Sequence, residues 1–209
     1  MYWKIYSMKV AIVFNHPYEG SYCNAILQSV ISGLKKANHE SDILHLDKEG
    51  FDPVMRSKDL EVFSRIKYTG EASLCCLDSK VLEYRERLEN ADHLIFIFPI
   101  WWELMPAMTK GFIDKVIFPG IAYDYGKRTM IKKWRQVKGV TLITTMNTPS
   151  IMYRLFFGNA IKKAFFTGTF WKTGYKNRKW ISLNMVKFVS DKKRKKWLAD
   201  IENRFEKLR

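Results

Sequence analysis

Three short segments of the sequence carry residue types that bind or orient small ligands, and each follows a run of apolar residues. The first, residues 15–24 (NHPYEGSYCN), places a histidine and small polar side chains before a helical pattern. A loop that opens a helix offers free backbone N–H groups and the positive end of the helix dipole, which suit a phosphate. The segment lacks the Gly-Lys-Ser/Thr and Gly-x-Gly-x-x-Gly patterns of the common nucleotide loops. The same residues also suit a plain connection in which Ser21 or Asn24 caps the helix, so both interpretations stay open.

The second segment, residues 99–106 (PIWWELMP), carries a pair of tryptophans at a place where loops are mostly polar. Trp101 and Trp102 would make a flat apolar wall for a planar ring system, although tryptophans are also enriched at subunit interfaces. We expect Glu103, which follows them, to face solvent. The third segment, residues 144–150 (TTMNTPS), is an ordinary polar loop, and its interest comes from its position after an apolar strand.

The elements that must position these segments are predicted from hydrophobic periodicity. Apolar, β-branched runs predict buried strands, and apolar residues three and four apart predict amphipathic helices. We read the stretch 47–79 as a long polar excursion and Asp191 as the N-cap of a terminal helix. The predicted strands are residues 9–14, 42–46, 93–98, 139–145 and 179–183, and the predicted helices are residues 24–36, 81–90, 106–117, 154–166 and 191–208.

The alternation of such strands and helices predicts an α/β fold with a doubly wound, five-stranded parallel sheet, strand order 2-1-3-4-5, and helices on both faces. In this topology the ligand crevice lies at the carboxyl ends of the first and third strands. The first two segments begin at those ends.

The composition is that of an ordinary folded domain, with 209 residues, 47% hydrophobic and 27% charged. We expect one domain over residues 1–209, with residues 1–7 as an N-terminal extension. The longest apolar run, residues 94–102, is far shorter than the about 20 residues of a membrane span. Three cysteines, two of them adjacent, indicate a reducing, cytoplasmic location, and no Cys-x-x-Cys spacing points to a metal.

Positive charge is the unusual feature of the composition, and it is confined to one part of the chain. The formal net charge is +15. Residues 1–126 hold 14 basic and 17 acidic residues, whereas residues 127–209 hold 22 basic and 4 acidic residues. The terminal helix, residues 191–209, includes the basic run Lys192–Lys196. No recognised nucleic-acid module accompanies this charge, so we expect no nucleic-acid partner, while an anionic surface or a membrane-protein partner stays open.

Several of these segments together resemble a known family. The match lies in FPIWWELMPAMTKGFIDKV (98–116), IAYDY (121–125), HPYEGSYCNAIL (16–27) and the pair Thr144–Thr145. Within the first of them, the shared positions are Pro99, Trp102, Met105, Pro106, Lys110, Gly111 and Asp114. In these features the chain resembles the flavodoxin-like NAD(P)H:quinone oxidoreductases, which include DT-diaphorase, the bacterial drug-activity modulators and the ancillary oxidoreductases of potassium-efflux systems. The resemblance runs from Lys9 to Tyr153 and is weak beyond it.

The resemblance implies a bound flavin, FAD or FMN, with its phosphate on the first segment and its ring beside the other two. Cys23 stands where family members usually have asparagine, so one phosphate contact would be lost or taken by Asn24. Tyr123 and Tyr125 would line a substrate pocket across a homodimer interface, and Tyr153 would also line it. The implied flavin-binding residues are His16, Ser21, Tyr22, Cys23, Asn24, Pro99, Ile100, Trp101, Trp102, Thr144, Thr145, Met146 and Asn147.

The resemblance also implies an activity in which NAD(P)H passes a hydride through flavin N5 to a quinone or a similar electrophile, with ping-pong turnover. The flavin performs this chemistry, so no catalytic side chain beyond it is expected. The alternative is a flavin-binding regulatory subunit that docks on a membrane transporter or another partner through its basic C-terminal part. A simple flavodoxin-type electron carrier is disfavoured, because such carriers are typically acidic.

Overall fold

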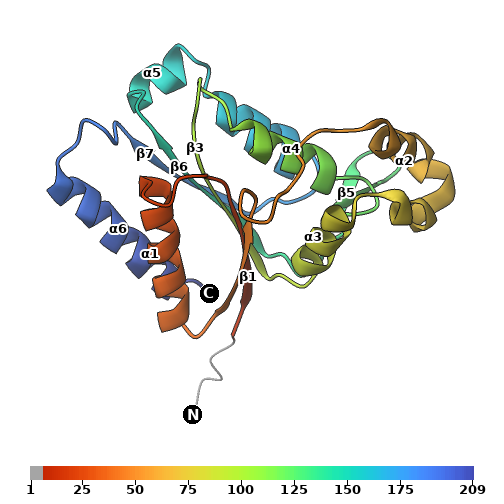
Figure 1. Ribbon diagram of the computed structural model, residues 1–209, viewed down its shortest axis with the longest axis horizontal. Helices are drawn as coiled ribbons and strands as arrows, with labels where there is room; N and C mark the ends of the chain where they lie inside the picture. The colour runs from red at the N-terminus through yellow and green to blue at the C-terminus, as the bar shows by residue number, and fades with distance from the viewer. Residues whose placement is uncertain (1–6) are drawn as a thin grey trace.

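The computed structural model describes residues 7–209, which form a five-stranded parallel sheet covered by helices on both faces (Figure 1). Residues 1–6, and with them most of the predicted N-terminal extension, lie outside the described residues. The strand order is β2-β1-β3-β6-β7, which confirms the predicted 2-1-3-4-5 order because β4 and β5 form a separate two-stranded hairpin. The strands are β1 (Lys9–Phe14), β2 (Glu40–His45), β3 (His93–Pro99), β4 (Tyr123–Tyr125), β5 (Met130–Lys132), β6 (Gly139–Met146) and β7 (Arg178–Asn184).

Successive side chains of the central strands enter two separate cores, one on each face of the sheet. Ile12 and Phe14 of β1 pack with one core, and Ala11 and Val13 pack with the other. This alternation explains why the central strands read as apolar without a polar face. The first core is covered by α1 (Tyr22–Lys36) and α6 (Asp191–Glu206), and the second by α3 (Ser79–Glu89), α4 (Ala107–Val116) and the π-helical segment η2 (Lys162–Trp171).

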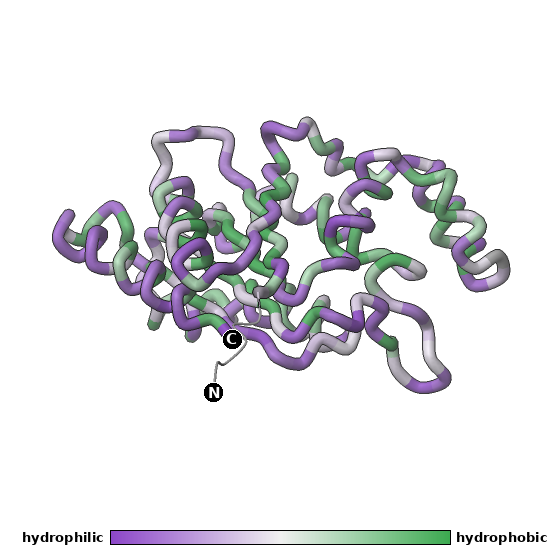
Figure 2. Tube along the Cα trace, turned by 90° about the horizontal axis from the view of Figure 1, so that it is seen from below, coloured by the Kyte–Doolittle hydropathy of each residue, from purple (hydrophilic) through white to green (hydrophobic). Residues whose placement is uncertain are grey.

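The two helices on the first face approach each other closely. A Cβ added to Gly33 of α1 would lie 2.3 Å from the carbonyl oxygen of Glu202 in α6. The absence of a side chain at Gly33 therefore allows the two backbones to meet. In Figure 2 the helices alternate between hydrophilic and hydrophobic along their length, as amphipathic helices do.

Two local predictions in the C-terminal part of the chain were wrong. The side chain of Ser190, rather than Asp191, caps α6 by accepting a hydrogen bond from the Lys193 N–H. The predicted helix 154–166 is instead two elements, α5 (Ser150–Leu155) and η2, because Gly158 and Asn159 take positive φ angles between them.

The stretch 47–79 is also more regular than predicted. It contains α2 (Ser57–Thr69) and the 3₁₀ segment η1 (Gly70–Cys76). Within residues 7–209, no helix combines the length and the apolar character needed to cross a membrane.

Candidate active site

The three segments singled out in the sequence lie side by side at the carboxyl edge of the sheet. The register aligns Phe14 with Ile97 and Pro99 with Thr145, so β1, β3 and β6 release their loops at neighbouring points. Two backbone hydrogen bonds continue the sheet into the loops: Asn15 N–H donates to the Ile97 carbonyl (3.1 Å), and Ile100 N–H donates to the Thr145 carbonyl (2.8 Å). The prediction that these segments meet at one edge is thereby confirmed.

Asn15 fixes the start of the first loop through two side-chain hydrogen bonds. It is buried, its amide group donates to the Asp47 carboxylate at 2.8 Å, and its side-chain oxygen accepts from the Thr109 hydroxyl at 2.9 Å. His16 follows it and accepts the Tyr18 N–H at Nδ1. Partial burial lowers the pKa of His16, although the nearby Asp47 charge acts in the opposite direction. The histidine is therefore a neutral, loop-shaping group at neutral pH.

The first turn of α1 presents backbone N–H groups toward this loop. Ser21 is the N-cap, and its hydroxyl accepts from the Asn24 N–H at 3.1 Å. The Asn24 side chain donates to the Glu19 carbonyl at 2.7 Å. The N–H groups of Tyr22 and Cys23 occupy the first two helical positions, where a helix supplies no acceptor. The capping interpretation is therefore confirmed for Ser21, and the N–H groups of Tyr22 and Cys23 keep anion binding open as a prediction.

Two of the predicted flavin-binding side chains in this segment face the protein instead. The Tyr22 hydroxyl donates to the Arg194 carbonyl of α6 at 2.8 Å, and its burial raises the pKa of Tyr22 to about 12. Cys23 is buried against Thr145, with 3.3 Å between its Sγ and the threonine Oγ1, and burial raises the pKa of Cys23 to about 11. The buried Cys23 thiol therefore packs α1 against β6 and is inert, whereas the Tyr22 side chain stays partly exposed.

The second loop makes a tight turn that displays an indole. Trp101 and Leu104 exchange backbone hydrogen bonds of 3.0 Å in both directions, while Trp102 and Glu103 between them have φ angles of 49° and 65°. The Trp102 side chain is 97% exposed, and the Trp101 ring meets the His16 ring edge-on at 6.0 Å. The turn therefore offers an open aromatic surface beside the first loop.

The amides of this loop are only partly available. Of the predicted flavin-binding residues Ile100, Trp101 and Trp102, the first two already donate their N–H groups within the protein. In the described part of the chain, the Trp102 N–H has no backbone acceptor.

Glu103 does not face solvent, so that prediction was wrong. Its carboxylate accepts from the Thr148 hydroxyl at 2.6 Å, and its carbonyl accepts from the Tyr153 hydroxyl at 3.0 Å. The second carboxylate oxygen is buried and has no hydrogen-bond partner among residues 7–209. Glu103 therefore joins the second loop to the third and leaves one buried acceptor at their junction. Its orientation depends on the positive φ angles of the turn, which the sequence did not signal at non-glycine residues.

The third loop is held in place by hydrogen bonds to residues of β7 and of the segment that follows it. Thr144 accepts from the Trp180 indole N–H at 2.9 Å, and the Asn147 side-chain oxygen accepts from the Lys187 N–H at 3.1 Å. Met146 and Thr145 are buried. Tyr153, a predicted substrate-pocket residue, is buried beneath the loop, and its hydroxyl also accepts the Ile161 N–H at 3.0 Å.

The other two predicted pocket tyrosines lie away from the three loops within one chain. Tyr123 is buried and Tyr125 is half exposed, with their rings 5.7 Å apart and nearly perpendicular. Tyr123 lines a cavity of about 230 Å³ together with Ile113 and Ile117 at the C-terminal end of α4. The second loop precedes the other end of that helix, which is about 15 Å long. One chain alone therefore does not bring these tyrosines to the candidate site.

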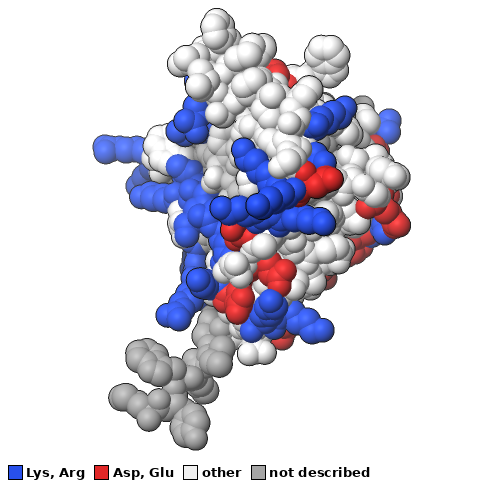
Figure 3. All heavy atoms as spheres, turned by 90° about the vertical axis from the view of Figure 1, so that its left-hand side faces the viewer, with Lys and Arg blue, Asp and Glu red and all other residues white. Residues whose placement is uncertain are grey.

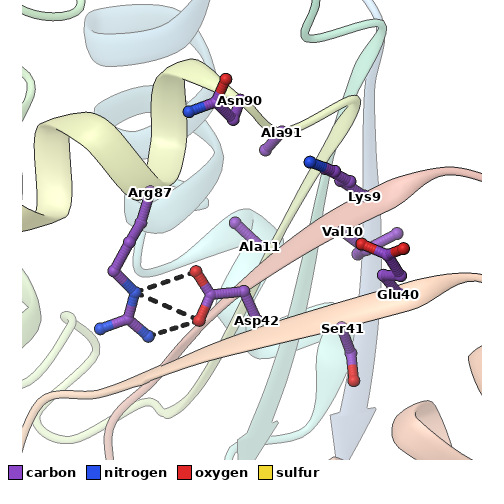
Figure 4. A pocket seen from close by; sticks show the side chains of 9 residues that line it. All are labelled: Lys9, Val10, Ala11, Glu40, Ser41, Asp42, Arg87, Asn90 and Ala91. Carbon is purple, nitrogen blue, oxygen red and sulfur yellow. Dashed lines mark hydrogen bonds and ion pairs between the residues drawn. The ribbon is translucent and has the colours of Figure 1, made fainter.

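A larger hollow, of about 260 Å³, belongs to the opposite edge of the sheet (Figure 4). Its lining includes Lys9, Glu40 and Asp42 at the amino ends of β1 and β2, and Arg87 of α3. The Arg87 guanidinium donates hydrogen bonds of 2.5–3.1 Å to the Asp42 carboxylate. Because Arg87 and Asp42 neutralise one another, we regard this hollow as a structural feature of the amino edge.

Comparison with known proteins agrees with this architecture. A profile of the family described as "Flavodoxin-like fold" matches residues 8–208. Among curated proteins, NAD(P)H dehydrogenase [quinone] 1 from Cavia porcellus is 28% identical over 155 residues, which cover 70% of this chain and 56% of that protein. The uncharacterised NAD(P)H oxidoreductase YcaK from Escherichia coli (strain K12) is 29% identical over 131 residues, or 63% of each chain. The chain thus spans little more than half the length of the first of these relatives.

Solved structures resemble the chain over almost its whole length. Smu.1420 from Streptococcus mutans UA159 is 31% identical, with a TM-score of 0.81 over 96% of this chain and 100% of that one. The NAD(P)H:quinone oxidoreductase from Methanothermobacter marburgensis has a TM-score of 0.83 at 24% identity, over 96% of both chains, and shows the fold alone. With nearly every described residue matched by the family profile, the chain belongs to the family with the flavodoxin-like fold.

Proposed function

We propose that the chain is an NAD(P)H-dependent flavin oxidoreductase that reduces quinones or similar electrophiles. The observation that carries the proposal is the meeting of three loops at the carboxyl edge, with free N–H groups on one loop and an exposed indole on the next. Several matched relatives bear names of this activity, including NAD(P)H dehydrogenase [quinone] 1 and ribosyldihydronicotinamide dehydrogenase [quinone]. Two structural neighbours were solved in complex with FMN.

The residues of the edge fit a flavin. The N–H groups of Tyr22 and Cys23, at the positive end of α1, would hold a phosphate. Trp101 and Trp102 would flank a planar ring, and the Trp102 N–H has no backbone acceptor in the described chain. The buried, unpartnered oxygen of Glu103 would accept a hydrogen bond from a ligand N–H or O–H group.

The protein's own part in the reaction is binding and orientation. When bound, the flavin would supply the transfer of a hydride from NAD(P)H to the acceptor. The rigid hydrogen bonds of Asn15 and Glu103 fix the first two loops relative to the sheet, so a ligand meets a preformed surface. We expect the nicotinamide and the acceptor to use the same surface in turn, which gives ping-pong kinetics.

A homodimer would complete this surface. Beside the third loop, α5 and the residues after it expose Ile151, Leu155 and Phe156, with exposed fractions of 68%, 73% and 78%. Such an apolar cluster is typical of a subunit interface. Tyr123 and Tyr125, which do not reach the three loops of their own chain, would then line the pocket of the partner. Sedimentation analysis of the purified protein tests the dimer.

A second candidate function, a regulatory subunit for a membrane transporter or another partner, draws on the basic face. Figure 3 shows lysines and arginines gathered on the side of the molecule where α6 lies. Lys187, Lys192, Lys193, Lys195 and Lys196 are exposed there. A face of one sign attracts an anionic partner through its field. A cytoplasmic location is part of the proposal and draws on the three free thiols.

The deciding experiment is flavin extraction from the purified protein, followed by a panel of hydride donors and quinones. We expect a yellow protein that yields FMN or FAD on acid extraction and is stabilised against heat by the flavin that it releases. Reduction of quinones by NADH or NADPH should give parallel lines in double-reciprocal plots. A colourless protein that neither FMN nor FAD stabilises would overturn the proposal, and flavin binding without quinone reduction would favour the regulatory role.

A further inference from the structure

The adjacent residues Cys75 and Cys76 form a pair of exposed thiols outside the site described above. They end η1, and their sulfur atoms lie 3.9 Å apart. The Cys75 thiol donates to the Ala72 carbonyl at 3.2 Å. The third cysteine, Cys23, is buried at the carboxyl edge. These two thiols are therefore the ones that a reagent in solution can reach.

The spacing of the two sulfur atoms suits a bridging atom better than a direct bond. A disulfide needs an S–S distance of about 2.05 Å, so Cys75 and Cys76 would have to close by almost half their separation across a single peptide unit. Two sulfur atoms bonded to one centre at about 2.3 Å lie about 3.4 Å apart when the bonds meet near a right angle and about 3.8 Å apart when the centre is tetrahedral. From the observed 3.9 Å, a bridging atom therefore requires the sulfur atoms to approach by about 0.5 Å or less, far less than a disulfide does.

The number of ligands narrows the kind of atom that could bridge the pair. Structural zinc requires about four protein ligands. Among residues 7–209, no group of three or more His, Cys, Asp or Glu side chains could hold a metal ion. A trivalent arsenic atom that already carries one organic group needs only two sulfur ligands.

The element that carries the pair is firmly held. The Glu71 carboxylate, near the start of η1, forms ion pairs with Lys133 and, at 3.0 Å, with Arg85. Leu74, directly before the pair, is buried in the core near Gly120. The two thiols are therefore presented on a packed turn, and little ordering is needed when both bind one atom. The Cys75 thiol also raises the pKa of Cys76, so the Cys76 thiol carries its proton at neutral pH.

We propose that Cys75 and Cys76 form a bidentate binding site for monosubstituted trivalent arsenicals. An arsenical R–As=O would form two As–S bonds, and the two thiol protons would leave with the arsenic-bound oxygen as one water molecule. No electrons are exchanged in this step. The proposal goes beyond the flavin chemistry and does not depend on it.

Phenylarsine oxide tests the site in the full-length protein. In the presence of excess glutathione, a monothiol competitor, we expect the intact mass to increase by one phenylarsine oxide less one water per chain. The dithiol 2,3-dimercaptopropanol should reverse the change. Half-saturation of Cys75→Ser and of Cys76→Ser should require about a hundredfold more reagent, because the second bond is then no longer intramolecular.

The matched control is Cys23→Ala, which should keep the adduct because its thiol is buried away from the pair. Both exposed positions tolerate serine without loss of packing, and thermal melting of each variant checks this. The proposal is overturned if the wild-type protein loses the reagent to glutathione, or if Cys75→Ser and Cys76→Ser retain it as the wild type does.

Discussion

The two edges of the parallel sheet are built from the ends of the same strands, yet they use their polar groups differently. At the amino edge, charged side chains pair with one another, as Arg87 does with Asp42 at 2.5 Å. At the carboxyl edge, side chains such as Asn15 and Glu103 hold the loops, and backbone N–H groups and an indole are left open. A binding edge is therefore recognised by the backbone and aromatic groups that its side chains leave unsatisfied. Changes at the amino edge should alter stability, and changes at the carboxyl edge should alter binding.

The largest expected effect belongs to His93 at the amino edge. It is buried at the start of β3, beside the Thr141 hydroxyl at 2.8 Å, and burial lowers the pKa of His93 to about 4. The folded protein holds this histidine neutral, whereas the unfolded chain protonates it below about pH 6.5. The stabilisation is therefore complete above pH 6.5 and is lost as the pH falls toward 4, by at most about 3 kcal/mol.

Denaturant unfolding at several pH values between 7.5 and 4.5 measures this loss. The variant His93→Gln should flatten the pH dependence of the free energy of unfolding, although His16 and His45, whose pKa values burial also lowers, leave a residual slope. Flavin affinity at neutral pH should stay at the wild-type value. An unchanged slope in the variant, or a loss of flavin binding, would break the distinction between the two edges.

The next effect is expected from Ser21→Asp at the carboxyl edge. Aspartate caps a helix as well as serine does, so the free energy of unfolding should change by less than about 0.5 kcal/mol. The added negative charge would repel a phosphate at the first turn of α1, and we expect the flavin Kd to rise about tenfold, or about 1.4 kcal/mol. Fluorescence titration of the apoprotein with flavin gives the Kd. The uncharged cap Ser21→Asn is the control, and equal affinity of both variants would place the phosphate elsewhere.

The smallest effect is expected from Trp102→Ala. Because this side chain is 97% exposed, its removal should leave the free energy of unfolding within about 0.5 kcal/mol of the wild type. Loss of an aromatic wall should raise the KM for quinone a few-fold, as stacking contacts contribute about 0.5–1.5 kcal/mol. Steady-state kinetics measures this change against Tyr68→Ala, which removes another exposed aromatic side chain from α2. Identical kinetics in the two variants would refute a wall at Trp102.

The sequence predicted the sheet, its order and the edge where the loops meet, because these depend on apolar runs and on chain order. It did not predict the β4–β5 hairpin, whose strands have three residues each and too little alternation to detect. The orientations of Cys23 and Tyr22 also escaped prediction. Their partners, Thr145 and Arg194, lie 122 and 172 positions away in the sequence. Local patterns carry no information about such contacts.

The close packing of Gly33 against α6 has a consequence for the order in which the protein is made. The helix α1 leaves the ribosome soon after the first strand, whereas α6 follows all five strands of the sheet. Until α6 arrives, the face of α1 that receives Ile201 and Phe205 has no cover. The α1 turn that presents its N–H groups at the carboxyl edge also lacks its tie to Arg194 during that time. The nascent chain therefore carries an uncovered apolar face until late in synthesis, and the turn at the carboxyl edge gains its tie to α6 only then.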